Sequence, residues 1–119
     1  MYEVFEKWLD ATLEQKLPED LLAFNFNIYD DGDNCWSVEL VGCDRFDESD
    51  PDWACEEIFD NRDEPFAWEE EAETDHIFAG AKLMVLQYLE DGAHADVLKA
   101  AQGVGIGFVD GDIELLHVK

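Results

Sequence analysis

The sequence predicts an α+β fold: a single domain, residues 1–119, with an antiparallel sheet of about five strands and helices packed on one face. The spacing of apolar residues changes between helical and strand-like in separated runs, in the order α-β-β-β-α-α-β-β. Hydrophobic residues make up 47% of the chain and aromatic residues 13%, which is enough to build a core. A chain of 119 residues is about the length of one domain.

The first element is an amphipathic helix that stops at Pro18. Its apolar residues recur at three- and four-residue steps: Tyr2, Phe5, Leu9 and Leu13. The period then changes to two in residues 24–28 and 36–40, which predicts two half-buried strands. Between them, residues 30–34 (Asp-Asp-Gly-Asp-Asn) supply the turn chemistry of a hairpin.

After the predicted hairpin comes a loop over residues 44–52. Residues 53–59 are too short for periodicity to separate a strand from a helix, and we favour a strand. Residues 66–68 could add an edge strand. If the edge of that strand is exposed, it could pair with a second copy of the chain, so a homodimer is possible.

The last third predicts two helices and a hairpin. A long helix that ends at Gly92 places apolar residues on one face: Ile77, Ala81, Met84, Val85 and Tyr88. A shorter helix over residues 94–102 should close at Gly103. Residues 104–108 and 113–118 then form strands, and Asp110-Gly111 between them suits a type I′ turn.

Charge is the strongest functional signal. The chain has 31 acidic and 7 basic residues, a formal charge of −24 at pH 7. Residues 30–75 hold 19 of the acids but only two basic residues, Arg45 and Arg62. Like charges on a folded surface repel one another, so a field of this size indicates either a need for solubility or a cationic partner. We expect a basic protein as that partner.

The same charge argues against nucleic acid and membrane surfaces as partners, because both present phosphate. No stretch approaches the ~18 consecutive apolar residues of a membrane span. Residues 1–6 lack the positive and apolar regions of a secretory signal. The sequence therefore predicts a cytosolic protein with no nucleic-acid partner and no membrane partner.

No metal, cofactor or catalytic residue is predicted. Cys35, Cys43 and Cys55 are odd in number and lie in or beside apolar segments, which favours reduced, buried thiols. There is no Cys-x-x-Cys pair and no His pair at helical spacing, and the acids of residues 44–57 do not fit the positions of a calcium loop. Most of the exposed carboxylates should be solvated and should have ordinary pKa values.

The glycine run at residues 103–107 does not indicate a phosphate site. It follows a helix and opens a strand, which is the reverse of a dinucleotide-binding turn. Gly103 should close the helix, while Gly105 and Gly107 should leave a flat strip on which other groups pack.

The candidate binding surface is the acidic segment from about Asp44 to Glu71. Trp53 follows Asp50-Pro51-Asp52, and an aromatic anchor ringed by acids has the composition of a hot spot for an Arg/Lys-rich partner. Trp53 and Trp68 could equally be core residues, because Trp is usually largely buried. The predicted partner-binding residues are Asp44, Asp47, Glu48, Asp50, Asp52, Trp53, Glu56, Asp60, Asp63, Glu64 and Trp68.

Three stretches carry a resemblance to a known family: residues 17–27 (Leu-Pro-Glu-Asp through Phe-Asn-Phe-Asn), 39–55 (Glu-Leu-Val-Gly-Cys through Asp-Trp-Ala-Cys) and 105–112 (Gly-Ile-Gly-Phe-Val-Asp-Gly-Asp). Together with the size, acidity and order of elements, they resemble small acidic bacterial immunity proteins of polymorphic toxin loci, broadly of the SUKH type. The resemblance implies a protein that neutralises a toxin by blocking it, without catalysis. It assigns no role to a single residue.

Two other functions are compatible with the sequence. A DNA mimic would block a nucleic-acid-binding protein by presenting long rows of carboxylates at phosphate-like spacing. A small enzyme or ligand-binding domain would need a concave pocket with convergent polar groups and a perturbed pKa.

Overall fold

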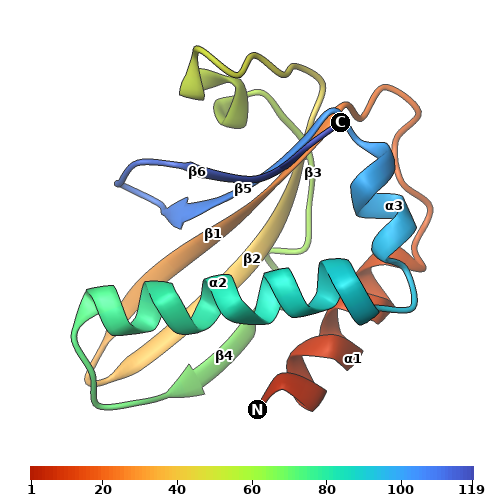
Figure 1. The fold of residues 1–119 in the computed structure, drawn as a ribbon. Helices are drawn as coiled ribbons and strands as arrows, with labels where there is room; N and C mark the ends of the chain where they lie inside the picture. Colours follow the sequence, from red (N-terminus) through yellow and green to blue (C-terminus); the bar gives the residue numbers. More distant parts are fainter.

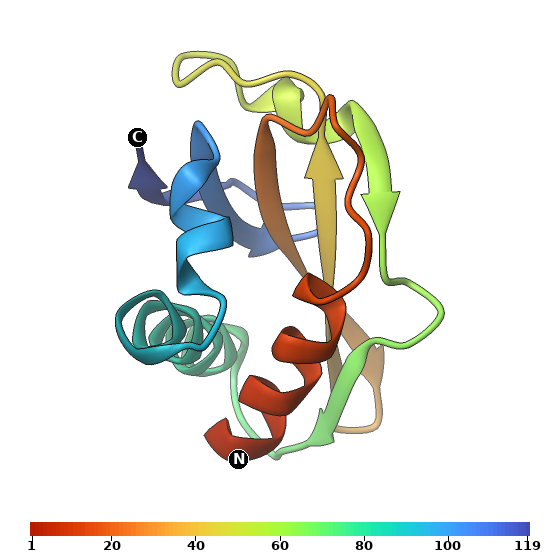
Figure 2. The same ribbon diagram turned by 90° about the vertical axis from the view of Figure 1, so that its right-hand side faces the viewer.

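The computed structural model describes all 119 residues, and its elements follow the predicted order with two additions. The helices are α1 (Tyr2–Leu13), α2 (Thr74–Asp91) and α3 (Ala95–Ala100). The strands are β1 (Ala23–Gly32), β2 (Cys35–Cys43), β3 (Glu57–Asp60), β4 (Phe66–Glu69), β5 (Gly103–Phe108) and β6 (Glu114–Val118). Of these, β4 is the further edge strand that residues 66–68 could add, which makes four strands before α2, and the 3₁₀ helix η1 (Pro51–Cys55) was not expected. All three helices cover one face of the sheet, so the predicted α+β layering is confirmed (Figures 1 and 2).

The sheet has six strands and is mixed. Its order is β3-β2-β1-β5-β6. Strand β4 pairs with the same edge of β2 as β3 does, but near the beginning of β2, whereas β3 pairs near its end. The β1–β5 pair is parallel, from Ala23 opposite Gly103 to Ile28 opposite Phe108, whereas every other pair is antiparallel. The predicted antiparallel sheet is therefore confirmed for four of the five strand pairs, and the β1–β5 pair is the exception. The chain returns through α2 and α3 to the end of the sheet where β1 begins, which is how parallel neighbours are joined.

The two hairpins close differently. In the first, Asp33 and Asn34 both have positive φ (53° and 64°), as a type I′ turn requires, and Gly32 before them has φ 84°. In the second, residues 109–113 form the connection between β5 and β6, and Gly111 does not have positive φ. The prediction of a hairpin is confirmed there, but the type I′ turn at Asp110-Gly111 is wrong.

The segment predicted as a strand over residues 53–59 is split. Its first part belongs to η1, where Pro51 occupies the first turn, as proline favours. Its second part belongs to β3, and residues 66–68 form most of β4, as expected for an edge strand. None of the three helices is both long enough and apolar enough to cross a bilayer.

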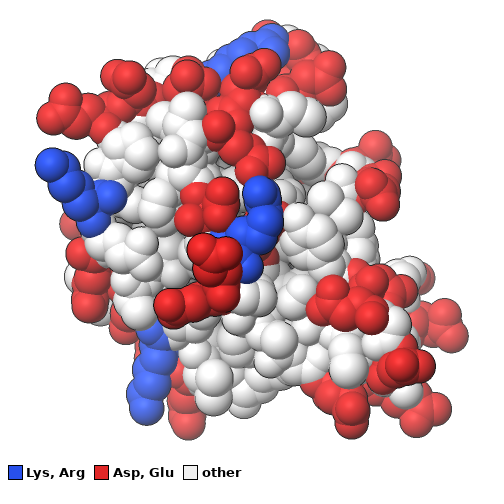
Figure 3. Space-filling view, turned by 180° about the vertical axis from the view of Figure 1, so that it is seen from behind, with Lys and Arg blue, Asp and Glu red and all other residues white.

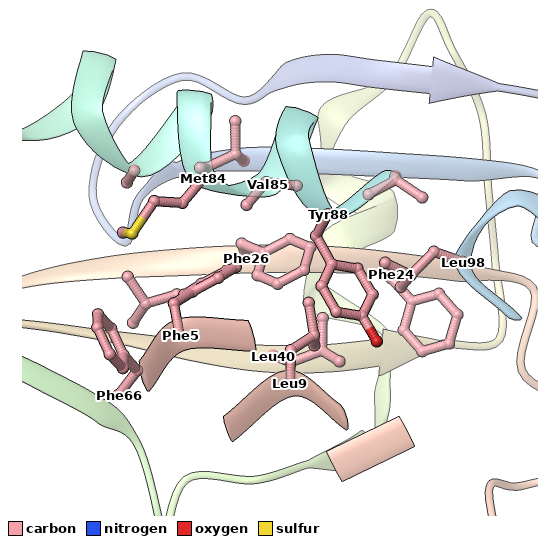
Figure 4. Close-up of a cluster of buried hydrophobic side chains, with 14 of the residues drawn as sticks. Phe5, Leu9, Phe24, Phe26, Leu40, Phe66, Met84, Val85, Tyr88 and Leu98 are labelled. Atoms are coloured by element: carbon pink, nitrogen blue, oxygen red, sulfur yellow. The ribbon is translucent and has the colours of Figure 1, made fainter. Parts of the chain in front are cut away.

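The main core lies between the helices and the sheet (Figure 4). Every residue predicted for the inner face of α2 is buried: Ile77, Ala81, Met84, Val85 and Tyr88. Tyr88 reaches from α2 toward α1, where its hydroxyl donates a hydrogen bond to Asp10 Oδ1 (2.6 Å) and accepts one from the backbone N–H of His94 (3.2 Å). This buried hydroxyl therefore joins α1, α2 and the start of α3, and it leaves no polar atom of Tyr88 unpaired.

Candidate functional site

The face of the sheet opposite the helices, which we call the helix-free face, carries the candidate site. Alternation along β1 turns Phe26 toward the helices and its neighbours Asn25 and Asn27 the other way. Residues 44–56, which we call the covering segment, lie over the end of this face where β1 begins (Figure 2). Beyond that segment no helix covers the face.

Trp53 holds the covering segment against the sheet. Its side chain is 1% exposed and packs with Ala23, Val41 and Cys43 in a second, smaller apolar cluster. The ring of Phe46 meets it edge-on, with the ring centroids 5.2 Å apart. Trp53 is therefore wrong as a predicted exposed anchor, because its indole is the core of the helix-free face and no partner can reach it.

Two glycines of β5 allow this close packing. A Cβ at Gly103 would collide with the ring of Phe46, and one at Gly105 would come within 3.4 Å of Trp53 Cζ2 and 2.7 Å of Asn25 Oδ1. A Cβ at Gly107 would collide with the backbone of Asp112, so the predicted flat strip of Gly105 and Gly107 is confirmed as a packing surface. Gly103, however, does not close a helix as predicted, because it is the first residue of β5.

A buried carboxylate lies at the centre of the helix-free face. Glu39 on β2 is 1% exposed, and both of its oxygens accept hydrogen bonds. Arg62 Nε donates to Oε1 at 2.7 Å, while Asn27 Nδ2 (3.1 Å) and the Tyr29 hydroxyl donate to Oε2. A buried carboxylate is tolerated only when it is paired in this way. Because both oxygens of Glu39 accept hydrogen bonds, the network holds the side chains of this face in place, and the carboxylate of Glu39 is not free to act as a base.

Arg62 connects this carboxylate to the surface. Its Nη2 lies 2.8 Å from Glu57 Oε1 and its Nη1 lies 3.7 Å from Asp60 Oδ2, so one guanidinium serves three carboxylates. Hydrogen bonds to Glu39 and Glu57 raise the pKa of Arg62 above its ordinary value. Burial, followed by the hydrogen bond to Glu39, raises the pKa of Tyr29 to about 12.

Glu39, Arg62 and Asn27 were missed as site residues when only the sequence was considered. The period-two pattern does place Asn27 and Glu39 on polar strand faces, and the hairpin register makes them direct cross-strand partners. That register includes a bulge between Asp30 and Gly32, which shifts the pairing and cannot be read from the turn residues alone. Arg62 is far from both in sequence, and nothing local predicts its contact.

Three of the predicted binding acids have internal partners. Asp47 accepts hydrogen bonds from Ser49, and these lower its pKa. Asp50 binds Arg45 Nη2 at 2.7 Å and caps η1 at the backbone N–H of residue 52, and the bond to Arg45 is the larger cause of its lowered pKa. Asp60 lies beside Arg62, as described above. These three carboxylates therefore stabilise the local structure of the segments in which they lie.

Six of the predicted acids are exposed, and their carboxylates have no hydrogen-bond or ion-pair partner in the protein: Asp44, Glu48, Asp52, Glu56, Asp63 and Glu64. The first four lie on the covering segment, and the last two lie in the loop between β3 and β4. Figure 3 shows acidic groups around the margin of the helix-free face, with uncharged surface between them and one central group of acids against a basic side chain. These carboxylates are available to a partner.

Trp68 belongs to a different part of the molecule. It lies on β4 opposite Trp36 of β2, faces the helix side, and packs against Phe66 with ring centroids 5.4 Å apart. Asp44 follows the opposite end of β2, eight residues beyond Trp36, so about 26 Å of strand separates the two positions. The predicted segment therefore does not form one compact patch, and a partner at the covering segment would not touch Trp68.

The thiols differ in burial. Cys43 is buried, Cys35 is half-buried and Cys55 is exposed, and none forms a disulfide, so the expectation of buried thiols is wrong for Cys55. Burial raises the pKa of Cys43 to about 12. No group of three or more His, Cys, Asp or Glu side chains is placed to hold a metal ion.

Comparisons with known protein families, with curated proteins and with solved structures give no match to this chain.

Proposed function

We propose that this chain is a non-catalytic binding protein that neutralises a basic protein, a toxin in the manner of an immunity protein, by covering its cationic surface. The observation that carries the proposal is the set of six exposed acids without internal partners on the covering segment and the β3–β4 loop. The resemblance to acidic immunity proteins supplies the toxin as the class of partner.

Electrostatics supports a cationic partner. The chain has 31 acids and 7 basic residues. Arg45 on the covering segment and Arg62 on the helix-free face are already bound to carboxylates. The remaining negative charge repels itself, and the approach of a cationic surface would relieve that repulsion. Such complementarity speeds diffusional encounter, which suits a protein that must block a toxin quickly.

Charge alone does not give tight binding, so apolar contacts are needed among the acids. With Trp53 buried, two exposed aliphatic residues can fill that role. Ile58 is 38% exposed beside Glu57, and Val109 is 48% exposed beside Asp110. Small anchors of this kind would make the contact depend more on charge than a tryptophan hot spot would.

The arrangement of the acids favours capture of a protein over mimicry of DNA. A DNA mimic needs long rows of carboxylates, whereas the acids in Figure 3 form separate groups around uncharged surface. A mixed surface of that kind complements a protein that has both basic and apolar residues.

The test is toxin rescue with a binding measurement. The product of the gene adjacent to this one would be expressed in a sensitive host with and without this chain, and the purified pair would be mixed by stopped flow at increasing salt. We expect restored growth, a stable complex, and an on-rate that falls steeply from low to physiological ionic strength. Absence of both rescue and complex would refute the proposal.

A further inference from the structure

A pocket of about 330 Å³ opens beside the covering segment. On one side it is bounded by residues of the covering segment and β3, and on the other by the connection between β5 and β6. Its size is at the lower end of ligand pockets, which run from about 300 to 1,000 Å³. It has room for a single side chain or a small ligand.

The charged groups that line the pocket are all acidic. Asp52, Glu57 and Asp112 contribute carboxylates, and no Lys, Arg or His lines it. Only Glu57 has a cationic partner, Arg62, while Asp52 and Asp112 have none. An anionic ligand would be repelled from such a pocket, and a cationic one would be attracted.

The walls between these carboxylates are apolar, with contributions from Ala54, Phe108 and Ile113. A ligand with an alkyl stem and a charged head matches this combination, since the stem packs on apolar atoms while the head meets carboxylates. A compact inorganic cation would leave the walls uncovered.

A buried acceptor behind the pocket wall is also unpaired. Asn25 is 1% exposed, and its Oδ1 has no hydrogen-bond partner. If Gly105 carried a Cβ, that atom would lie 2.7 Å from this oxygen and 2.7 Å from Ile113 Cγ2. The acceptor therefore lies beside Ile113, a residue that lines the pocket. The Nδ2 of Asn25 is already bound to Asn27, which also lines the pocket. An unpaired buried acceptor is unfavourable, and this oxygen is one more acceptor without a donor beside the pocket.

We propose that this pocket receives an arginine side chain of the basic partner. The two charged side chains at the pocket that lack a partner, Asp52 and Asp112, are both acceptors. A guanidinium brings five N–H donors in a planar fork to such a pair, whereas a lysine brings three at one point. The inference rests on the proposed function and specifies where the partner inserts. The alkyl stem of the inserted arginine lies along Phe108 and Ile113, and its guanidinium lies between the carboxylates of Asp52 and Asp112.

The test is a titration of the isotope-labelled protein with a hexa-arginine peptide, followed by NMR, with hexa-lysine in parallel. The chain offers a matched pair of variants, because Asp112 lines the pocket and Asp110, two residues away in the same exposed connection, does not. Asp112→Asn is expected to weaken hexa-arginine binding about 3- to 10-fold, the loss of one charge-assisted contact, while Asp110→Asn stays within about twofold. The backbone amides of residues 52–57 and 108–113 should shift most, and hexa-lysine should bind more weakly.

Two outcomes overturn the inference in different ways. Equal weakening by both variants, or shifts spread over all the acidic loops, would mean that only net charge attracts the peptide; the pocket would then be rejected and the proposed function kept. No binding of either peptide at low salt would contradict the proposed function as well. Ala54→Leu narrows the pocket without changing charge and should weaken hexa-arginine binding in a variant whose near-ultraviolet circular dichroism is unchanged.

Discussion

The two faces of the sheet are built on different principles. The helix-covered face is continuous and apolar, with twenty buried residues from all three helices and from β1, β2, β4 and β5. The helix-free face has only four buried residues in its apolar cluster, around Trp53, and its centre is a charged network around Glu39. The first face holds most of the buried apolar residues of the domain. The second carries the covering segment, with four exposed acids that have no partner within the protein, and this difference is why we place recognition there.

The largest expected effect comes from a truncation on the helix-covered face. Phe26 is fully buried and central to the main core, so Phe26→Ala should lower the free energy of unfolding by about 3–5 kcal/mol. Urea denaturation followed by far-ultraviolet circular dichroism would measure it. A loss below about 1 kcal/mol would show that this face does not carry the stability of the domain.

Breaking the charged network at Arg62 should lower the free energy of unfolding by an intermediate amount, and a second substitution at Glu39 should restore most of it. Arg62→Gln leaves the carboxylate of Glu39 buried without its cation, and we expect a loss of about 1–3 kcal/mol, reduced from that of a fully buried pair because Arg62 is 52% exposed. The double variant with Glu39→Gln should recover most of that loss, since no buried charge remains. If the double variant is as unstable as the single one, the ion pair is not what Arg62 contributes.

Alkaline pH should destabilise both faces. Burial and hydrogen bonding raise the pKa of Tyr29 to about 12 on the helix-free face and also raise that of Tyr88 on the other face. The folded pKa lies above the unfolded value of about 10, so this contribution to stability is complete below pH 10 and is lost as pH rises toward 12. Absorbance at 295 nm should show little tyrosinate before the chain unfolds. Full ionisation near pH 10 in the folded protein would contradict the two hydroxyl contacts.

The acids of the covering segment should affect stability least, and in the opposite direction. Neutralising three of them (Asp44→Asn, Glu48→Gln, Glu56→Gln) removes repulsion and no internal contact, so stability should rise by about 1 kcal/mol or less. Thermal unfolding at low salt would measure it. A clear loss of stability would mean that these carboxylates hold the segment in place and are not free for a partner.

The sequence predicts the helix-covered face well and the helix-free face poorly. The burial of Tyr88 and Met84 follows from spacing within one helix, which is local information. The burial of Trp53 does not, because it depends on Gly103 and Gly105, some fifty residues away, allowing the covering segment to approach. The same holds for Arg62, whose partner Glu39 lies on another strand. The parallel β1–β5 pair depends on the path of the chain through α2 and α3, and the local pattern of neither strand contains it.

The position of recognition can be tested directly by comparing two variants that lose the same charge from different faces. One is the covering-segment triple variant above, and the other neutralises three exposed acids near the end of α2 and on α3: Glu90→Gln, Asp91→Asn and Asp96→Asn. The measurement is the stopped-flow association rate with the proposed basic partner at low ionic strength. We predict that the covering-segment variant associates several-fold more slowly, while the helix-side variant stays close to the parent. Equal slowing of both would contradict this proposal, because it would show that the partner responds to the net charge of the protein and not to the helix-free face.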